Sequence, residues 1–224
     1  MLLIDLDPQG NATSGVGVDR NEDITSVYDV LVNITAMEQA TVVTEFENLS
    51  VCPSNVDLAG AEIELVGVEN RENCLKIALS KVKDDYDYII IDCPPSLGLL
   101  TLNAFVCADT ILIPIQCEYY ALEGLSQLIK TIRLVKKGLN PSLDIEGVLL
   151  TMFDARTNLS IQVADEVKKY YPKKVYASVI PRNVRLSEAP SYGQPITVYD
   201  ENSKGAESYT KLANEVIERN EGVK

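Results

Sequence analysis

The chain has 224 residues, of which 46% are hydrophobic and 24% are charged. This is enough apolar sequence to bury the core of one large α/β domain, and no segment has the composition of a disordered region. The formal net charge of −13 excludes a protein covered in basic residues for nucleic acid, but it leaves room for a local basic patch. We expect a single domain over residues 1–224.

The sequence also argues against a membrane span, disulfides and a histidine-based site. No run approaches the roughly 18 uninterrupted apolar residues of a membrane span, and no apolar signal core follows a basic segment, so we expect a cytoplasmic protein. The five cysteines form no CxxC pair, which indicates reduced core thiols. Histidine is absent, so any hydrolysis would rely on carboxylates, a metal and positioning.

Short apolar, β-branched runs alternate with longer helical patterns, which predicts an α/β fold with a doubly wound, mostly parallel sheet flanked by helices. Strands are expected near residues 2–6, 48–52, 87–92, 109–115, 144–152 and 175–180. Helices are expected near residues 25–32, 57–66, 70–84, 99–107, 121–138, 159–171 and 204–219. Ligands of such sheets bind beyond the carboxyl ends of the strands, so residues that follow each strand are the functional candidates.

The first predicted strand, in MLLIDLDPQG, ends in two aspartates. Strand alternation would put Asp5 and Asp7 on one face and Leu6 on the other. Two carboxylates this close repel each other, so the pair suggests a cation, a phosphate-bound metal or a water molecule to be activated.

A second strand, in YDYIIIDCPPSLG, ends in Asp92. An aspartate at this position can hold Mg²⁺ and its waters at a nucleotide phosphate, as in the Walker B motif. The alternative is an aspartate that only caps the next turn. Asp5 and Asp7 at the end of another strand favour the metal site, and the stiff loop 94–98 is able to change position when a terminal phosphate is present.

Arginines follow two later strands. Arg156 comes after EGVLLTMFD, and Arg182 and Arg185 come after VYASVIP. Arginines on loops at one side of a sheet can contact DNA phosphates without reading bases. The alternative is that they are solvated or pair with some of the 33 acidic residues. Four lysines could widen this basic patch: Lys168, Lys169, Lys173 and Lys174. The alternative is that they are solvated at a helix end, where they interact favourably with the helix dipole.

Four segments, in this order and spacing, resemble the ParA/Soj partitioning ATPases of the deviant Walker A class, which also contains MinD. They are DLDPQGNATSG, IIIDCPPSLGLLTLNA, PIQCEYYALEGL and IPRNVRLSEAPSYGQPI. The resemblance covers essentially all of the chain. It implies a P-loop NTPase-like fold, ATP and Mg²⁺ as cofactors, an ATP-dependent homodimer, nonspecific DNA binding, and hydrolysis stimulated by a ParB/Spo0J-like partner.

The resemblance also implies roles for single residues. Asp7 would position the attacking water, Asp92 would be the Walker B aspartate, and Asp5 would lie near the magnesium through water. Pro181 and Arg182 of the IPRN segment would lie near the adenine. Glu118 and Tyr119 resemble the loop that approaches the nucleotide and the dimer partner, although an acid that starts a helix beside a core aromatic explains them equally well. Arg156 and Arg185 match arginines that contribute to DNA binding.

One departure from the family pattern limits these expectations. ParA proteins carry a first strand, a KGGVGKT-type loop and a helix before the DLDPQ strand, whereas none of the 224 residues form a G-x-x-x-x-G-K-[ST] pattern. That loop cradles the phosphates, so this chain alone is expected to bind MgATP weakly and to be inactive. We expect an N-terminally truncated chain, in preference to a shortened one that works without ATP.

We therefore expect a partitioning ATPase of chromosome or plasmid, located in the cytoplasm and on the nucleoid. The alternative is a non-catalytic remnant that binds DNA or a partner. A third hypothesis is an iron–sulfur ATPase that uses cysteines at a dimer interface. The C-terminal segment has a polar face that is acidic and not basic, which disfavours a membrane anchor.

Overall fold

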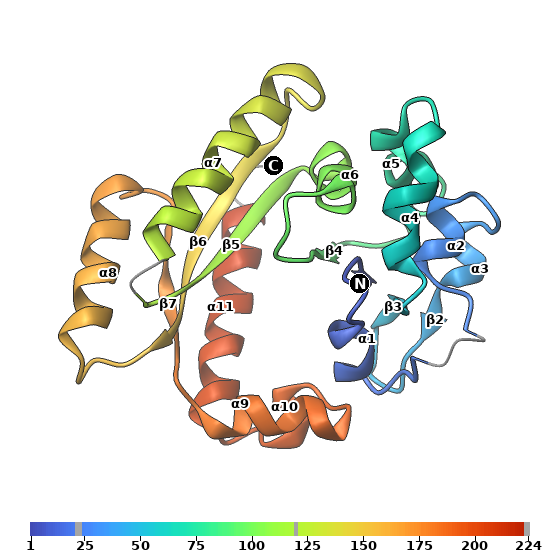
Figure 1. Ribbon diagram of the computed structural model, residues 1–224. Coiled ribbons are helices and arrows are strands. Elements are labelled where there is room, and N and C mark those ends of the chain that lie inside the picture. The colour runs from blue at the N-terminus through green and yellow to red at the C-terminus, as the bar shows by residue number, and fades with distance from the viewer. Residues whose placement is uncertain (21–23, 119–120, 222–224) are drawn as a thin grey trace. The chain divides into compact units, whose positions relative to one another are not determined.

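The computed structural model describes residues 1–20, 24–118 and 121–221 (Figure 1). The chain divides into two compact units. Unit 1 contains Met1–Ala108, Lys137–Pro141 and Pro190–Gln194, and unit 2 contains Asp109–Lys136, Ser142–Ala189 and Pro195–Lys224. The expectation of a single domain over residues 1–224 stays a prediction. No helix among the described residues is both long and apolar enough to cross a bilayer.

Unit 1 is built on a four-stranded sheet with the order β2-β3-β1-β4. Its strands are β1 (Leu2–Asp5), β2 (Val42–Val43), β3 (Ser50–Cys52) and β4 (Ile89–Asp92). Strand β1 pairs in parallel with β3 and β4, and the short β2 is antiparallel to β3. Leu2 and Ile4, which share one face of β1, are completely buried, and Leu3 on the other face is half-buried. The sheet therefore brings the carboxyl ends of β1 and β4 together.

The helices of unit 1 are short. They are α1 (Asn11–Gly15), α2 (Val27–Leu31), α3 (Met37–Ala40), α4 (Leu58–Glu64), α5 (Cys74–Leu79) and α6 (Leu99–Cys107), with 3₁₀ turns at Leu65–Gly67, Arg71–Asn73 and Lys83–Asp85. Helix α2 begins with a capping box, in which the Ser26 hydroxyl accepts from Tyr28 N and Ser26 N donates to Asp29. This reciprocal cap compensates for the small number of hydrogen bonds in so short a helix.

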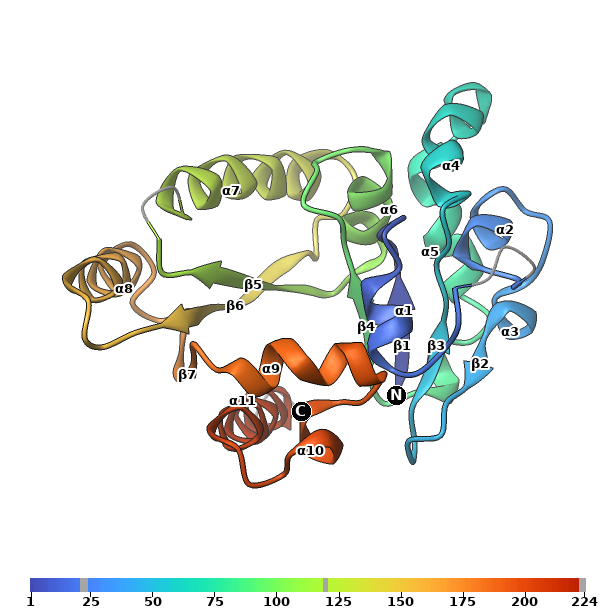
Figure 2. The same ribbon diagram turned by 60° about the horizontal axis from the view of Figure 1, so that its bottom comes forward.

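Unit 2 contains a parallel three-stranded sheet with the order β5-β6-β7. Its elements are β5 (Thr110–Gln116), α7 (Ala121–Gly138), β6 (Asp144–Phe153), α8 (Asn158–Tyr170), β7 (Val175–Pro181), α9 (Val184–Glu188), α10 (Ile196–Tyr199) and α11 (Lys204–Glu221), and a 3₁₀ turn at Ala189–Tyr192 follows α9. Right-handed crossovers put α7 and α8 on one face of this sheet, and α11 covers the other face (Figure 2). Tyr176, Ile180 and Leu212 are part of the core beneath α11.

The predicted mostly parallel α/β architecture is confirmed, and all six predicted strands and the long helices are present. Among the described residues, the short strands and α-helices that were not predicted are β2, α1, α3, α9 and α10, and the 3₁₀ turn at Ala189–Tyr192 was not predicted either. The helix predicted over residues 70–84 is wrong as one element, because it consists of α5 between two 3₁₀ turns. The left-handed backbone of Asn70 separates this segment from the preceding turn, and Leu75 and Leu79 supply its buried face.

Candidate functional site

Three aspartates meet at the carboxyl ends of β1 and β4. Asp5 and Asp92 are direct partners in the parallel register, and Leu6 N donates to Asp92 O at 2.8 Å. Asp7 N donates to Asp5 Oδ1 at 3.2 Å. Because β1 ends at Asp5, the direction of Asp7 is set by this turn and not by strand alternation. The structure thus brings together the three carboxylates that the sequence pointed to.

Asp5 is completely buried, and its carboxylate organises the loop that follows β1. Its Oδ2 atom accepts from Thr13 N and from Thr13 Oγ1, both at 2.7 Å. The Thr13 hydroxyl in turn accepts from Ser54 N at 3.0 Å. Asp5 therefore caps the first turn of α1 and ties this loop to β1 and to the segment after β3.

The turn between Asp7 and α1 requires glycine at residue 10. Gly10 has a φ of 60°, in the left-handed region, and a Cβ there would lie 2.6 Å from an Arg20 side-chain carbon. Gly10 N donates to Asp7 O at 2.9 Å, and Gln9 N donates to Asp7 Oδ1 at 2.9 Å. These bonds hold the Asp7 carboxylate in place. Thr13 was not predicted from the sequence as a functional residue. The available signal was its position shortly after the turn at Gly10, which follows Asp5.

Asp92 has a carboxyl group whose pKa is shifted by its surroundings. Although much of its surface is exposed, desolvation of the carboxyl group and the negative charges of Asp5 and Asp7 raise the pKa of Asp92 to about 6. A cation beside it would favour the ionised form. Within the described residues, no group of three or more possible ligands is arranged to hold a metal on its own. Carboxylate oxygens such as those of Asp92 and Asp5 are the kind of ligand that Mg²⁺ prefers, and their role at a metal stays a prediction.

Replacing Asp92 with asparagine should raise thermal stability at neutral pH and leave it unchanged near pH 4. The folded pKa lies above the ordinary value of 3.8, so the folded chain keeps this proton where the unfolded chain loses it, and stability falls as pH rises from about 4 to 6. Solvent screening limits the gain to about 1–3 °C at pH 7.5 in a calorimetric scan. The exposed Asp87→Asn is the control. Equal shifts of Asp92→Asn at both pH values would contradict this explanation.

In unit 2, a cavity of about 740 Å³ opens at the carboxyl ends of β5 and β6. Arg182 pairs with Glu118 at 3.4 Å at its edge, and Pro181 ends β7 opposite Phe153. Tyr119 lies outside the described residues. The lining is largely apolar and includes Ile115, Gln116, Leu125, Met152 and Ser160. Glu118 and Arg182 are therefore adjacent, and their role in nucleotide binding stays a prediction.

Of the predicted DNA-binding arginines, Arg156 lies on the loop after β6 as expected, whereas Arg185 lies in helix α9 and not on a loop, because the Asn183 side chain caps that helix by accepting from Arg185 N. Each of the two arginines is paired with acids. Arg156 binds both carboxylate oxygens of Asp154, at 2.9 and 2.7 Å, and this hydrogen bonding lowers the pKa of Asp154 to about 2. Arg185 pairs with Glu188 at 2.9 Å and with Asp200 at 3.3 Å. The structure thus shows the alternative considered from the sequence, in which the arginines pair with acidic residues. Arg156 nevertheless exposes 88% of its side chain.

Two of the four candidate lysines also lie beside acids. Lys174 binds Asp144 at 2.9 Å and the carbonyl of Ile145 at 2.6 Å, and Lys169 lies 3.6 Å from Glu166. Lys174 therefore has a structural role at the amino end of β6, at the opposite end of that strand from Asp154.

Comparisons with known proteins agree with the fold and the motifs. A family model described as an AAA domain matches residues 1–145. The chain is 62% identical to the sporulation initiation inhibitor protein Soj of Bacillus subtilis, over 96% of this chain and 85% of Soj. It is 56% identical to the chromosome partitioning protein ParA of Myxococcus xanthus, over 97% of this chain and 77% of that protein. The structure of a cobyrinic acid a,c-diamide synthase from Mycobacterium smegmatis with bound ADP and magnesium is 38% identical, with a TM-score of 0.85, over 100% of this chain and 83% of that one.

Proposed function

Because this chain belongs to the Soj/ParA family of chromosome-partitioning ATPases, we propose that it works in the partitioning of a chromosome or plasmid, driven by ATP and Mg²⁺. The observation that carries the proposal is the cluster of Asp5, Asp7 and Asp92 at the ends of two paired parallel strands. A solved structure 38% identical to this chain contains ADP and magnesium, which supports the choice of cofactors.

In this proposal each aspartate has a separate task. Asp7 orients the water that attacks the terminal phosphate, and the bonds from Gln9 N and Gly10 N to Asp7 hold it in place. Asp92 binds the waters of Mg²⁺, and Asp5 supports this site from its buried position. Magnesium, when bound, neutralises charge on the phosphates. Glu118, Pro181 and Arg182 take part in nucleotide binding, as the resemblance to the family implies.

The proposed binding partners of this chain are also those that the resemblance to the family implies. The ATP-bound protein forms a homodimer that binds DNA of any sequence through Arg156 and Arg185, and a ParB/Spo0J-like partner stimulates hydrolysis. The site of action is the nucleoid in the cytoplasm. The exposed position of Arg156 supports this assignment, since its exchange from Asp154 to a DNA phosphate requires no unfolding.

Nucleotide binding and hydrolysis test the proposal directly. The 224 residues contain no phosphate-binding loop pattern, so we expect calorimetry to show weak MgATP binding by this polypeptide. A fusion that places a strand–loop–helix of the G-x-x-x-x-G-K-[ST] pattern before Met1 should hydrolyse ATP. In that fusion, Asp7→Ala should keep ATP binding but slow hydrolysis about 100-fold or more, whereas Asp92→Ala should also weaken magnesium-dependent binding. Turnover of Asp7→Ala at the rate of the exposed control Asp87→Ala would contradict the role of Asp7.

DNA binding by the same fusion tests the arginines. We expect ATP-dependent binding to unrelated duplexes with equal affinity, and a steep loss of affinity as salt rises, because phosphate contacts release counterions. Arg156→Glu and Arg185→Glu should each weaken binding to all duplexes alike, measured by filter binding. Asp154→Asn should strengthen it by freeing Arg156. Arg133→Glu, an exposed arginine on α7, is the matched charge control, and an equal loss in that variant would show that only net charge matters.

A further inference from the structure

Helix α4 and the 3₁₀ turn after it carry apolar residues on two opposite faces. Leu58, Ala61 and Leu65 form the inner face and are at most 1% exposed. Val56, Ile63 and Val66 are 65%, 77% and 63% exposed. The backbone is already turning at Val56, since Ala59 N donates to Val56 O, so residues 56, 59, 63 and 66 follow one another at helical spacing. We call Val56, Ala59, Ile63 and Val66 the outer stripe.

A surface helix needs only one apolar stripe, which faces its own core. A second stripe that lies in water contributes nothing to the stability of unit 1 and is typical of an interaction surface. The stripe is also firmly supported, because the inner face is buried. Glu64, beside Ile63, accepts hydrogen bonds from Tyr28 Oη at 3.0 and 3.2 Å. The surface is therefore preformed, which lowers the entropic cost of binding.

The charges around the outer stripe are mostly negative, although Arg71, whose guanidinium donates to the carbonyl of Val66 at 2.8 Å, is a cation beside it. Residues 56–70 include four acids and no lysine or arginine: Asp57, Glu62, Glu64 and Glu69. A second copy of the chain, stacked here about a two-fold axis, would bring these carboxylates against themselves, and nucleic acid or an anionic membrane would be repelled as well. The complementary ligand is an apolar ridge flanked by positive charges.

We propose that the outer stripe of α4 binds a cationic amphipathic helix of a partner protein. Its apolar side chains cover Ile63 and Val66, and its lysines or arginines pair with Glu64 and Glu69, as in helix-in-groove recognition. The proposal uses neither the carboxylate cluster nor nucleotide, so it stands or falls independently of the proposed function.

Binding of a designed peptide to the polypeptide of residues 1–224 tests this surface. The probe is a fluorescein-labelled, 14-residue helical peptide of leucine and lysine, and binding is followed by fluorescence anisotropy without nucleotide. We expect Ile63→Gln with Val66→Gln to weaken binding about tenfold or more, because the apolar contact is lost. The matched control changes Val43→Gln and Ile77→Gln, which are also exposed, and should bind as the parent does. All substituted side chains are exposed, and circular dichroism checks that each variant is folded.

Two further arms separate apolar contact from simple charge attraction. Glu64→Gln with Glu69→Gln should weaken binding and reduce its salt dependence. A scrambled peptide of the same composition, which has no apolar face, should bind as weakly as the stripe variant. Equal binding by the stripe variant and its control would overturn the proposal. The proposal would also be overturned if ultracentrifugation showed that the polypeptide forms a dimer and that the stripe variant does not. That result would assign the surface to a second copy of the chain.

Discussion

Thr13→Val is expected to lower the free energy of unfolding by about 2–4 kcal/mol, because it removes a buried hydroxyl that serves two partners. Valine has nearly the shape of threonine but no hydroxyl. The Asp5 carboxylate, which is completely buried, would lose one of its donors, and Ser54 N would lose its acceptor. Each unsatisfied group of this kind costs about 1–3 kcal/mol. Urea unfolding followed by circular dichroism measures the change as a lower midpoint with an unchanged slope.

Thr13→Ser is the matched control, because serine keeps the hydroxyl and removes only a methyl group. We expect it to cost about 1 kcal/mol. The difference between the two variants isolates the hydrogen bonds to Asp5 and Ser54. If valine and serine shifted the midpoint equally, this network would make no net contribution, and the position of Asp7 would have to depend on the turn bonds from Gln9 and Gly10 alone.

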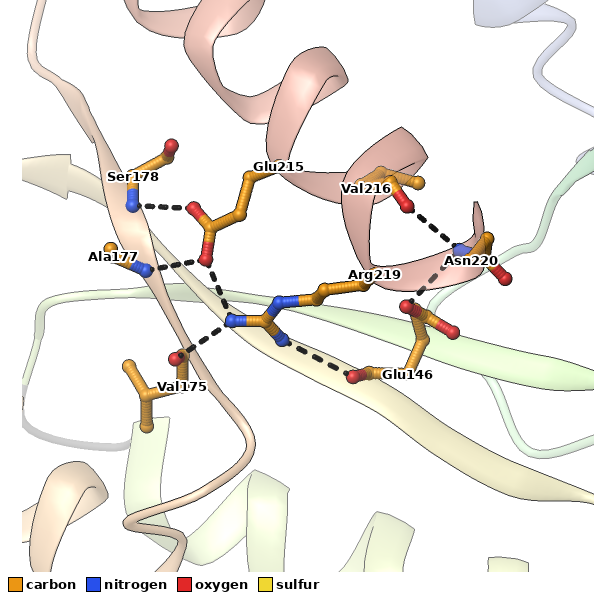
Figure 3. A network of polar contacts seen from close by, with 8 residues as sticks. All are labelled: Glu146, Val175, Ala177, Ser178, Glu215, Val216, Arg219 and Asn220. Carbon is orange, nitrogen blue, oxygen red and sulfur yellow. Dashed lines mark hydrogen bonds and ion pairs between the residues drawn. The ribbon is translucent and has the colours of Figure 1, made fainter. Parts of the chain in front are cut away.

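Arg219→Ala is expected to have the second largest effect, about 2–3 kcal/mol in the same measurement. Arg219 lies in the last turn of α11 and connects this helix to β6 and β7 (Figure 3). Its guanidinium donates to Glu215 at 2.6 Å and to the carbonyl of Val175 at 3.2 Å, and it stacks 4.0 Å from the centre of the Tyr176 ring. Alanine would remove all of these contacts at once.

The partner of Arg219 has a structural task of its own. Glu215 accepts from Ala177 N at 2.8 Å and from Ser178 N at 2.9 Å, where the register of β7 against β6 shifts (Figure 3). These N–H groups belong to an edge strand, and the carboxylate satisfies them in place of a further strand. Without Arg219, this carboxylate, whose side chain is only 18% exposed, would have no counter-ion in the network of Figure 3.

The loss in Arg219→Ala should depend on pH. Partial burial raises the pKa of Glu215, but the hydrogen bonds from Ala177, Ser178 and Arg219 outweigh it and lower this pKa below the ordinary value of 4.5. A lowered carboxyl pKa stabilises the fold at pH values above 4.5, and this contribution disappears as pH falls through the folded pKa. The destabilisation should therefore be full at pH 7 and smaller near pH 3.

Lys211→Ala provides the matched control on the same helix. Lys211 and Glu207 form an i,i+4 pair at 2.6 Å, but both side chains are about two-thirds exposed. We expect a loss below about 0.5 kcal/mol, as is usual for solvated pairs. Arg219→Lys should lie between the two, because lysine keeps the charge but not the planar fork that stacks on Tyr176. Losses of equal size in Arg219→Ala and Lys211→Ala would contradict the role of the stacked, partly buried arginine.

The sequence predicted the elements whose signal is local and repeated. Strands such as Ile89–Asp92 are continuous apolar runs, and α7 and α11 repeat apolar residues every three or four positions over 18 residues. Helix α1, with five residues, is too short to show such a period, and the carboxylate that caps it, Asp5, precedes it across a turn. Its existence depends on a contact that no local pattern contains.

The sequence by itself determined that Asp5, Asp7 and Asp92 lie at or just after the ends of strands and that the motifs are those of a partitioning ATPase. Only the tertiary structure decided what surrounds them. The pairing of Asp5 with Asp92, the buried bond from Thr13 to Asp5, and the ion pair of Arg185 with Asp200 join residues from different elements. Strand register and packing set these distances, and neither is encoded in the spacing of one segment, because each depends on how two segments bury their apolar faces together.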